Sequence, residues 1–228
     1  MSTKFGRSRS SLCEIFLHVI NELYDRWGSL LYLNKKLLAQ NMDRYCDAVT
    51  AKGALLSNLF GFIDGTKLQT CRISSTGSGE NLQRQVYSGH KRIHCLNYQA
   101  VTAPDGICLY FFGPVEGRRH LMEQFANDRS FLKGNSLTAE RQEFNKWMSR
   151  VRQSVEWNFK MLKSLWAIIT FKTLSKIRLS PVVIVVAVAM LLTNCHCCHF
   201  EGNQISQFFG LKPPTVREYL DTLEKIDI

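Results

Sequence analysis

Apolar residues recur at helical spacing near the start of the chain, separated by polar and charged positions. Six of them follow the i, i+3, i+4 pattern of a helix with one apolar face: Leu12, Ile15, Phe16, Val19, Ile20 and Leu23. A second helix is predicted at about 36–50. The pattern therefore predicts a helical segment over residues 1–58.

Between residues 59 and 114 the pattern changes to short β-branched and aromatic runs, LFGFIDGT, KRIHCLNYQAVT and ICLYFFGPV. Such runs, punctuated by Gly, Pro and Asp, are typical of strands. The stretch APDG at 103–106 has Pro at its second position and Gly at its fourth, which suits a type I turn. The segment therefore predicts three consecutive strands in an antiparallel meander.

From about residue 136 the pattern is helical again, with Ser136, Thr138 and Glu140 as candidates for the N-terminal cap. Near the C-terminus, the double proline at 213–214 precedes a short amphipathic helix. Helices on both sides of a compact set of strands indicate a layered α/β or α+β domain.

The run PVVIVVAVAMLL at 181–192 is the one stretch apolar enough to suggest a membrane span. Its twelve residues fall short of the roughly 20 that cross a bilayer. We therefore expect a buried central helix here, and no membrane as a partner.

A chain of 228 residues with 45% hydrophobic and 21% charged residues has the composition of a globular protein, with one domain or one domain and a small lobe. Its formal net charge of +10 indicates an anionic partner, above all nucleic acid.

Eight cysteines are scattered along the chain, and no apolar secretory signal is seen in MSTKFGRSRSS. Reduced thiols in a cytosolic or nuclear protein are therefore expected. The cluster CHCCHF at 195–200 resembles a zinc site at first sight. Ligands that are adjacent in the chain cannot all face one ion, so no structural metal is expected there.

The stretch GFIDGTKLQTCR at 61–72 ends an apolar run with the single carboxylate of Asp64. Asp-Gly is a strong signal for a two-residue hairpin, because both residues tolerate positive φ. Alternatively, an acid at the end of a buried strand is well placed to hold a metal ion. Taken alone, the stretch favours the hairpin.

A second informative stretch surrounds Glu156. Four residues predict the buried stripe of a helix: Val155, Phe159, Leu162 and Trp166. Glu156, Lys160 and Lys163 form a neighbouring i, i+4, i+7 row. That row fits an ordinary solvated face with an ion pair between Glu156 and Lys160. It also fits a metal ligand beside two phosphate-binding cations, although the row alone favours the solvated face.

Six blocks stand out along the chain: FGRS (5–8), FGFIDGT (60–66), YSGHKRIHCLNYQAV (87–101), GPVEGRRH (113–120), EFNKWMSRVRQSVEW (143–157) and FGLKPPTVREYL (209–220). Together, and in this order, they resemble the DDE endonuclease domain of PIF/Harbinger-type transposases and their domesticated nuclease relatives.

The resemblance implies an RNase H-like fold, in which a mixed sheet is flanked by helices. It also implies three acids that hold two Mg²⁺ or Mn²⁺ ions for phosphodiester hydrolysis or strand transfer on DNA. Carried over by motif, Asp64 is the first acid and Glu156 the third, and both are expected metal ligands.

The middle acid departs from the family pattern, because no Gly-Asp-x-x-Tyr motif follows the GPVEGRRH block. Asp128 is the only Asp in the gap and is the candidate for the catalytic position. The departure implies a shortened domain that lacks one interior strand. An alternative function follows from it: a catalytically inactive relic that binds DNA or a protein.

Basic residues of the matching blocks are the predicted DNA contacts: His90, Lys91, Arg92, Arg118, Arg119, Arg152, Lys160 and Lys163. The family implies DNA as the substrate, an element-encoded DNA-binding protein as a partner, and a nuclear location, with the cytoplasm as a further one. The expected organisation is an N-terminal helical segment (1–58), a DDE endonuclease-like core (59–194) and a C-terminal tail with a short helix (195–228).

Overall fold

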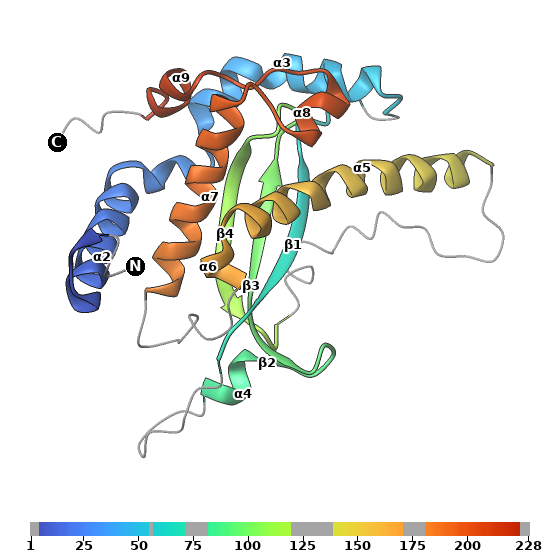
Figure 1. Cartoon of the computed structure of the whole chain (residues 1–228). Helices are drawn as coiled ribbons and strands as arrows, with labels where there is room; N and C mark the ends of the chain where they lie inside the picture. The colour runs from blue at the N-terminus through green and yellow to red at the C-terminus, as the bar shows by residue number, and fades with distance from the viewer. Residues whose placement is uncertain (1–4, 55–56, 72–81, 120–138, 171–180, 224–228) are drawn as a thin grey trace.

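The computed structural model describes residues 5–54, 57–71, 82–119, 139–170 and 181–223. Within them, an antiparallel sheet is packed against helices (Figure 1). The presence of a sheet packed against helices confirms the expected α/β class. The RNase H-like arrangement stays a prediction.

The sheet is built around β3 (Ile93–Thr102), which pairs with three antiparallel neighbours. They are β1 (Phe62–Gln69), β4 (Cys108–Glu116) and the two-residue β2 (Tyr87–Ser88). The predicted meander of three long strands is confirmed, in the order β1-β3-β4. Within the described ranges, β1 lies at an edge of the sheet and has β3 as its one partner strand.

The predicted turn at 103–106 connects β3 to β4, and Gly106 N–H donates to the Ala103 carbonyl at 2.9 Å. Gly106 has a φ of +88°, and an added Cβ would clash with the Asn203 side chain, so this position requires glycine. Asp105 is fully buried in the turn, where it accepts from Tyr45 Oη at 2.7 Å and from Ile107 N–H at 3.0 Å. Burial raises the pKa of the Asp105 carboxyl to about 6.

Two helices precede the sheet: α2 (Arg9–Trp27) and α3 (Lys35–Ala51), joined by the 3-10 helix η1 (Gly28–Leu31). Both predicted helices of the N-terminal segment are therefore confirmed. Ser8 caps α2 by accepting from Ser11 N–H, and Asn34 caps α3 by accepting from Leu37 N–H.

The apolar stripe predicted for α2 is only partly covered. Ile20 is buried, whereas Ile15, Phe16 and Val19 are exposed. Helical periodicity thus predicted the helix correctly, but one face of it has no cover from the described residues.

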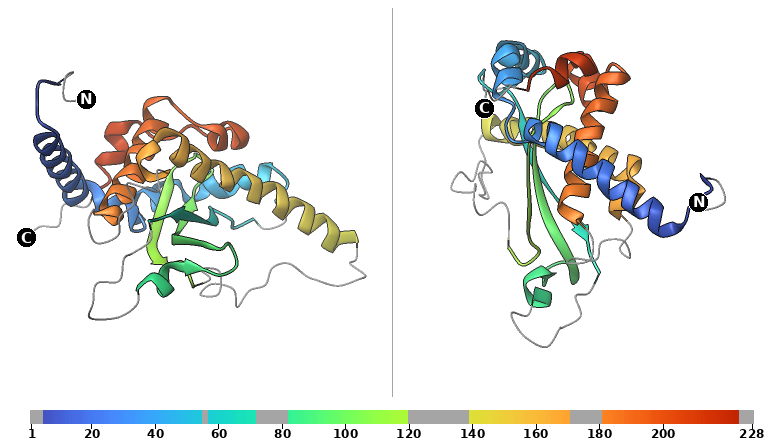
Figure 2. Two further views of the ribbon diagram at one scale, coloured as in Figure 1. Left: turned by 60° about the horizontal axis from the view of Figure 1, so that its bottom comes forward. Right: turned by 90° about the vertical axis from the view of Figure 1, so that its left-hand side faces the viewer.

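The remaining helices are short except for two. They are α4 (Leu82–Val86), α5 (Ala139–Leu165), α6 (Ala167–Thr170), α7 (Val182–His199), α8 (Gln204–Phe209) and α9 (Val216–Leu220). Helix α9 follows the double proline, as predicted. The long helices α5 and α7 lie against the sheet, α5 beside β1 and α7 beside β4, while α3, α8 and α9 gather at one end (Figures 1 and 2).

Helix α7 includes the apolar run and continues through the Cys/His cluster to His199. By length and composition it could cross a membrane, and 56% of it is buried inside the molecule. Asn194 connects α7 to β4 by two hydrogen bonds. Its Oδ1 accepts from the N–H of Cys108, and its Nδ2 donates to the C=O of Cys108. The expected buried central helix is confirmed. Residues from all three predicted segments contribute to one hydrophobic cluster, including Leu30, Leu109 and Tyr219.

A candidate metal-binding site between β1 and α5

Asp64 is the third residue of β1, where it pairs with Ala100 of β3. The hairpin interpretation of Asp-Gly is wrong, because the ladder continues past Gly65 to Gln69. The expectation that Asp64 ends its strand is also wrong, since five more strand residues follow it. The alternation of side chains places Asp64 on the face of β1 that carries the buried Phe62, Thr66 and Leu68.

Glu156 projects from the part of α5 that packs on the sheet. Phe159 and Leu162 are buried beneath it, and Trp166 packs against the same core, which confirms these members of the predicted stripe. The side chain of Val155 lies outside the described part of the chain. Glu156 itself is exposed.

Asp64 and Glu156 line the same cleft, which has a volume of about 430 Å³. The strand β1 contributes Asp64, Gly65 and Thr66, and α5 contributes Glu156, Phe159, Lys160 and Lys163. The two acids predicted to converge do so in space, although they are far apart in the sequence.

Lys163 is held inside the cleft by a hydrogen bond from its Nζ to Thr66 Oγ1, 2.7 Å long. Burial lowers the pKa of the Lys163 ammonium, and the nearby Asp64 carboxylate acts in the opposite direction. The ion pair predicted for Glu156 and Lys160 is not among those formed by the described residues. The row of Glu156, Lys160 and Lys163 therefore lines a cleft that contains both carboxylates and ammonium groups.

A buried hydrogen bond fixes the register of α5 against the sheet close to Glu156. Asn158 Nδ2 donates to Thr102 Oγ1 at 2.7 Å, and both side chains are buried. Phe62, two residues before Asp64, stacks on Phe209 of α8 with ring centroids 5.3 Å apart. The first contact holds α5 against β3 next to Glu156, and the second holds α8 against β1 next to Asp64.

Sequence reasoning missed Thr66 and Asn158. The period of two along a strand could have indicated Thr66, because it shares a face with Asp64. Asn158 carried no such signal, since its role depends on which residue of β3 lies opposite α5.

The donor set fits a hard divalent cation, since Mg²⁺ and Mn²⁺ prefer carboxylate oxygens and water. Asp64 and Glu156 would hold such an ion from two different elements. Within the described ranges, however, no group of three His, Cys, Asp or Glu side chains is close enough to hold a metal.

The candidate middle acid, Asp128, lies outside the described residues. Arg152 belongs to α5, but its side chain is also outside the described part.

The basic turn His90-Lys91-Arg92 connects β2 to the start of β3, whereas Asp64 pairs near the end of β3. Arg92 precedes Ala100, the partner of Asp64, by eight residues. At about 3.3 Å per strand residue this corresponds to roughly 26 Å.

Arg118 and Arg119 follow the end of β4, towards the same end of the sheet as the basic turn. Arg118 N–H donates to the carbonyl of Gln85 in α4, and Arg119 pairs with Glu116 at 3.2 Å. The structure therefore brings Lys160 and Lys163 to the acids, while the other described basic residues lie away from the cleft.

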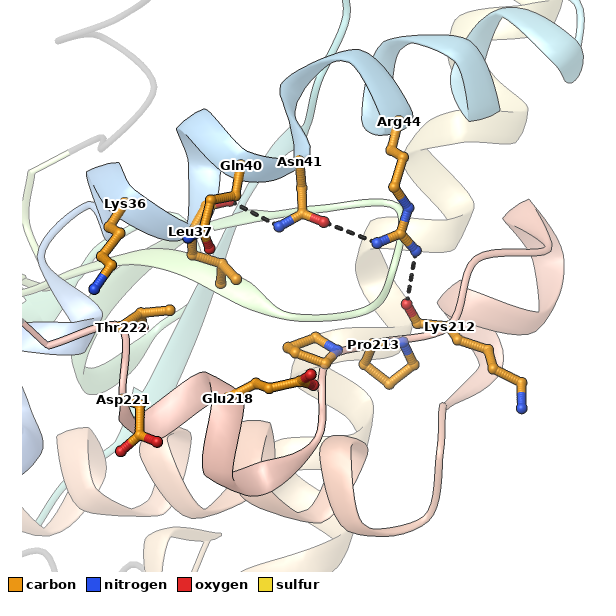
Figure 3. Close-up of a pocket in the computed structure, with 11 residues that line it drawn as sticks. Lys36, Leu37, Gln40, Asn41, Arg44, Lys212, Pro213, Glu218, Asp221 and Thr222 are labelled. Carbon is orange, nitrogen blue, oxygen red and sulfur yellow. Dashed lines mark hydrogen bonds between the residues drawn. The ribbon is translucent and has the colours of Figure 1, made fainter.

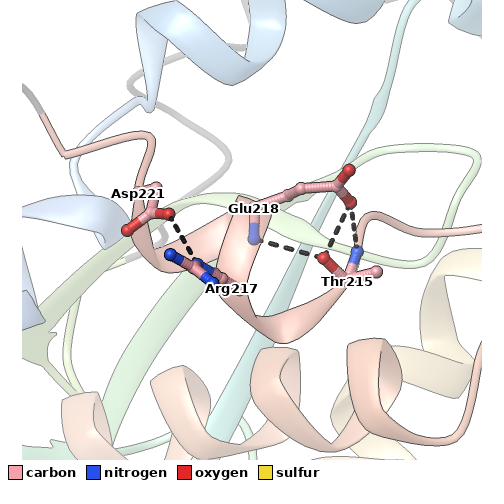
Figure 4. Close-up of polar contacts among 4 residues, drawn as sticks. All are labelled: Thr215, Arg217, Glu218 and Asp221. Carbon is pink, nitrogen blue, oxygen red and sulfur yellow. Dashed lines mark hydrogen bonds and ion pairs between the residues drawn. The ribbon is translucent and has the colours of Figure 1, made fainter.

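A larger cleft, of about 650 Å³, lies between α3 and the C-terminal segment 212–222 (Figure 3). Its carboxylates already have structural partners. Glu218 accepts from the N–H of Thr215 in the cap of α9, and Asp221 pairs with Arg217 at 3.7 Å (Figure 4). This cleft is therefore a poorer candidate for a metal site than the one between β1 and α5.

Comparison with known families gives one match, to the DDE superfamily endonucleases over residues 122–194. The matched third of the chain includes Asp128 and Glu156 but not Asp64. The predicted superfamily is supported by this match, and the PIF/Harbinger subtype and the truncation stay predictions. No curated protein and no solved structure matches the chain.

Proposed function

We propose that the chain is a divalent-metal-dependent DNA endonuclease domain of transposase origin, of the PIF/Harbinger type. The observation that carries the proposal is the shared cleft of Asp64 and Glu156. The similarity to DDE superfamily endonucleases over residues 122–194 supports a nuclease of the transposase class.

In this function Asp64 and Glu156 hold Mg²⁺ or Mn²⁺. The bound metal would supply the Lewis acid that activates a water and stabilises the leaving oxygen. Lys160 and Lys163 line the same cleft and offer ammonium donors to the phosphate oxygens of the DNA strand. Phe159 forms an apolar wall that limits access of water to the reacting phosphate.

The DNA would extend beyond the cleft to the basic turn at 90–92. The separation of roughly 26 Å corresponds to about eight base pairs at 3.4 Å each. Phosphate contacts at both ends would position a duplex but carry no sequence information. An element-encoded DNA-binding protein would supply the choice of target, and the site of action would be the nucleus.

The second candidate function is an inactive relic that binds DNA or a protein through the same basic groups. One observation favours it: the described residues place two carboxylates in the cleft and no third. Whether Asp128 completes the set decides between the two candidates.

A nicking assay on supercoiled DNA with Mg²⁺ or Mn²⁺ tests the proposal. We expect nicking by the unsubstituted chain and at least a hundredfold loss in Asp64→Asn and Glu156→Gln, because each change removes a ligand charge. Glu143→Gln is the matched control, an exposed acid on the same helix outside the cleft.

Equal nicking by all four proteins would contradict the assignment of the site. No nicking by any of them, with salt-dependent DNA binding retained, would identify the relic.

A further inference from the structure

Lys163 is held in the cleft that Asp64 and Glu156 line. It follows Glu156 by seven residues, so both side chains lie on one face of α5. Its Nζ is tied to Thr66 Oγ1, and Thr66 shares a face of β1 with Asp64. The ammonium is half-buried and interacts electrostatically with Asp64. The Lys163 ammonium is therefore held in place by the cleft, whereas the side chain of Lys160 is exposed.

The charges of the cleft limit how many metal ions it can hold. Two divalent ions and the Lys163 ammonium would place five positive charges against the two negative charges of Asp64 and Glu156. Like charges a few ångströms apart repel strongly where water is partly excluded. A single ion and the ammonium bring three positive charges, which the two carboxylates neutralise much better. Lys160, at the rim of the same cleft, adds to this bias.

We infer that the cleft binds one divalent cation, between Asp64 and Glu156, and that Lys163 is the second cationic group of the site. Its ammonium would face the phosphate where a second metal ion would otherwise lie, and it needs no third carboxylate to hold it. The inference rests on the proposed nuclease function and departs from the two-ion arrangement expected of the family.

Titration of the DNA-free full chain with Mn²⁺, followed by the electron paramagnetic resonance signal of free Mn²⁺, tests the inference without an activity measurement. We expect one Mn²⁺ per chain, and loss of that ion in Asp64→Asn. Lys163→Met should bind one Mn²⁺ on the order of tenfold more tightly, because a nearby positive charge is removed. Lys163→Arg keeps the charge and should bind as the unsubstituted chain does.

The matched control is Lys146→Met, which removes an exposed lysine of α5 outside the cleft. It should leave the Mn²⁺ affinity unchanged. Thermal unfolding monitored by circular dichroism establishes that each variant is folded. The number of ions bound by the unsubstituted chain does not depend on the folding of any variant.

Two Mn²⁺ ions per chain would overturn the inference, and loss of one of them in Asp128→Asn would identify the third carboxylate. An affinity of Lys163→Met equal to that of Lys146→Met would also overturn it. Absence of Mn²⁺ binding together with absence of nicking would instead refute the proposed function.

Discussion

The role of Asp64 depends on its register, since it pairs with Ala100 in a ladder that runs without interruption from Phe62 to Gln69. Residue types alone indicated either a hairpin or a ligand, because Gly65 next to an acid is common to both. The extended backbone at Gly65 requires no positive φ, and its neighbours leave room for a Cβ at ordinary contact distance. Pairing with Ala100, 36 residues further along the chain, therefore decided a question that the local sequence left open.

Asp105 gives a prediction for stability as a function of pH. Burial raises the pKa of its carboxyl from 3.8 to about 6, against the opposing hydrogen bond from Tyr45. The folded chain thus binds this proton more tightly than the unfolded chain does. The stabilising contribution is fully present below pH 3.8 and is lost as the pH rises through 6. The loss amounts to about 3 kcal/mol.

Asp105→Asn should remove this contribution, because the amide keeps an acceptor for Ile107 N–H but does not ionise. Urea unfolding at pH 4 and pH 8 measures it. We expect the difference in unfolding free energy between the two pH values to change by about 2.5 kcal/mol between the variant and the unsubstituted chain, because pH 4 lies just above the pKa of the unfolded carboxyl. An identical pH dependence of the two proteins would contradict a buried, titrating Asp105.

At the scale of elements, periodicity predicted the helices α2, α3 and α5, and it placed α3 close to its observed bounds. It could not predict which apolar face is covered, because burial depends on partners from elsewhere in the chain. The stripe of α5 is buried at Phe159 and Leu162, whereas Ile15 and Val19 of α2 remain exposed. The length of helix α7 was underestimated for a related reason. The helix continues past the apolar run at 181–192 to His199, and Cys197 and Cys198 are buried there like small apolar residues.

A pair of substitutions measures this difference between helices. Leu162 is 0% exposed and Val19 is 47% exposed. Leu162→Ala should lower the unfolding free energy by about 2–5 kcal/mol. Val19→Ala should lower it by less than about 1 kcal/mol. Chemical denaturation followed by circular dichroism gives both values, and a large loss in Val19→Ala would show that the face of α2 is covered in solution.

At the scale of the whole molecule, composition indicated an anionic partner but not where it would bind. The described basic residues of the predicted DNA surface divide between the cleft, with Lys160 and Lys163, and the far end of the sheet, with the turn at 90–92. The sequence blocks identified these residues as DNA contacts but not how far each lies from the acids. The turn at 90–92 precedes the start of β3, and Asp64 pairs near the end of β3, so the length of this strand lies between the two groups of basic residues.

This division predicts the salt dependence of DNA binding. Lys91→Ala combined with Arg92→Ala removes two phosphate contacts at the far end of the sheet. The slope of log K against log salt concentration should therefore become shallower by about 1.8. Fluorescence anisotropy with a duplex of about 20 base pairs at several salt concentrations measures the slope.

Lys35→Ala combined with Lys36→Ala, on exposed positions of α3, is the control for the loss of two charges. An equal change in both double variants would indicate a general effect of net charge rather than a DNA contact at the turn.

Helix α5 carries Glu156 in the cleft and, within two turns, the side chains that attach it to the sheet. Substitutions in descendants of this chain could therefore remove the metal ligand Glu156 without removing the residues that hold the fold together. A lineage that abandoned catalysis while keeping the protein would be free to replace Glu156, but would still have to retain Asn158, Phe159 and Leu162. The pattern of change along this one helix would record whether selection had acted on a nuclease or only on a scaffold.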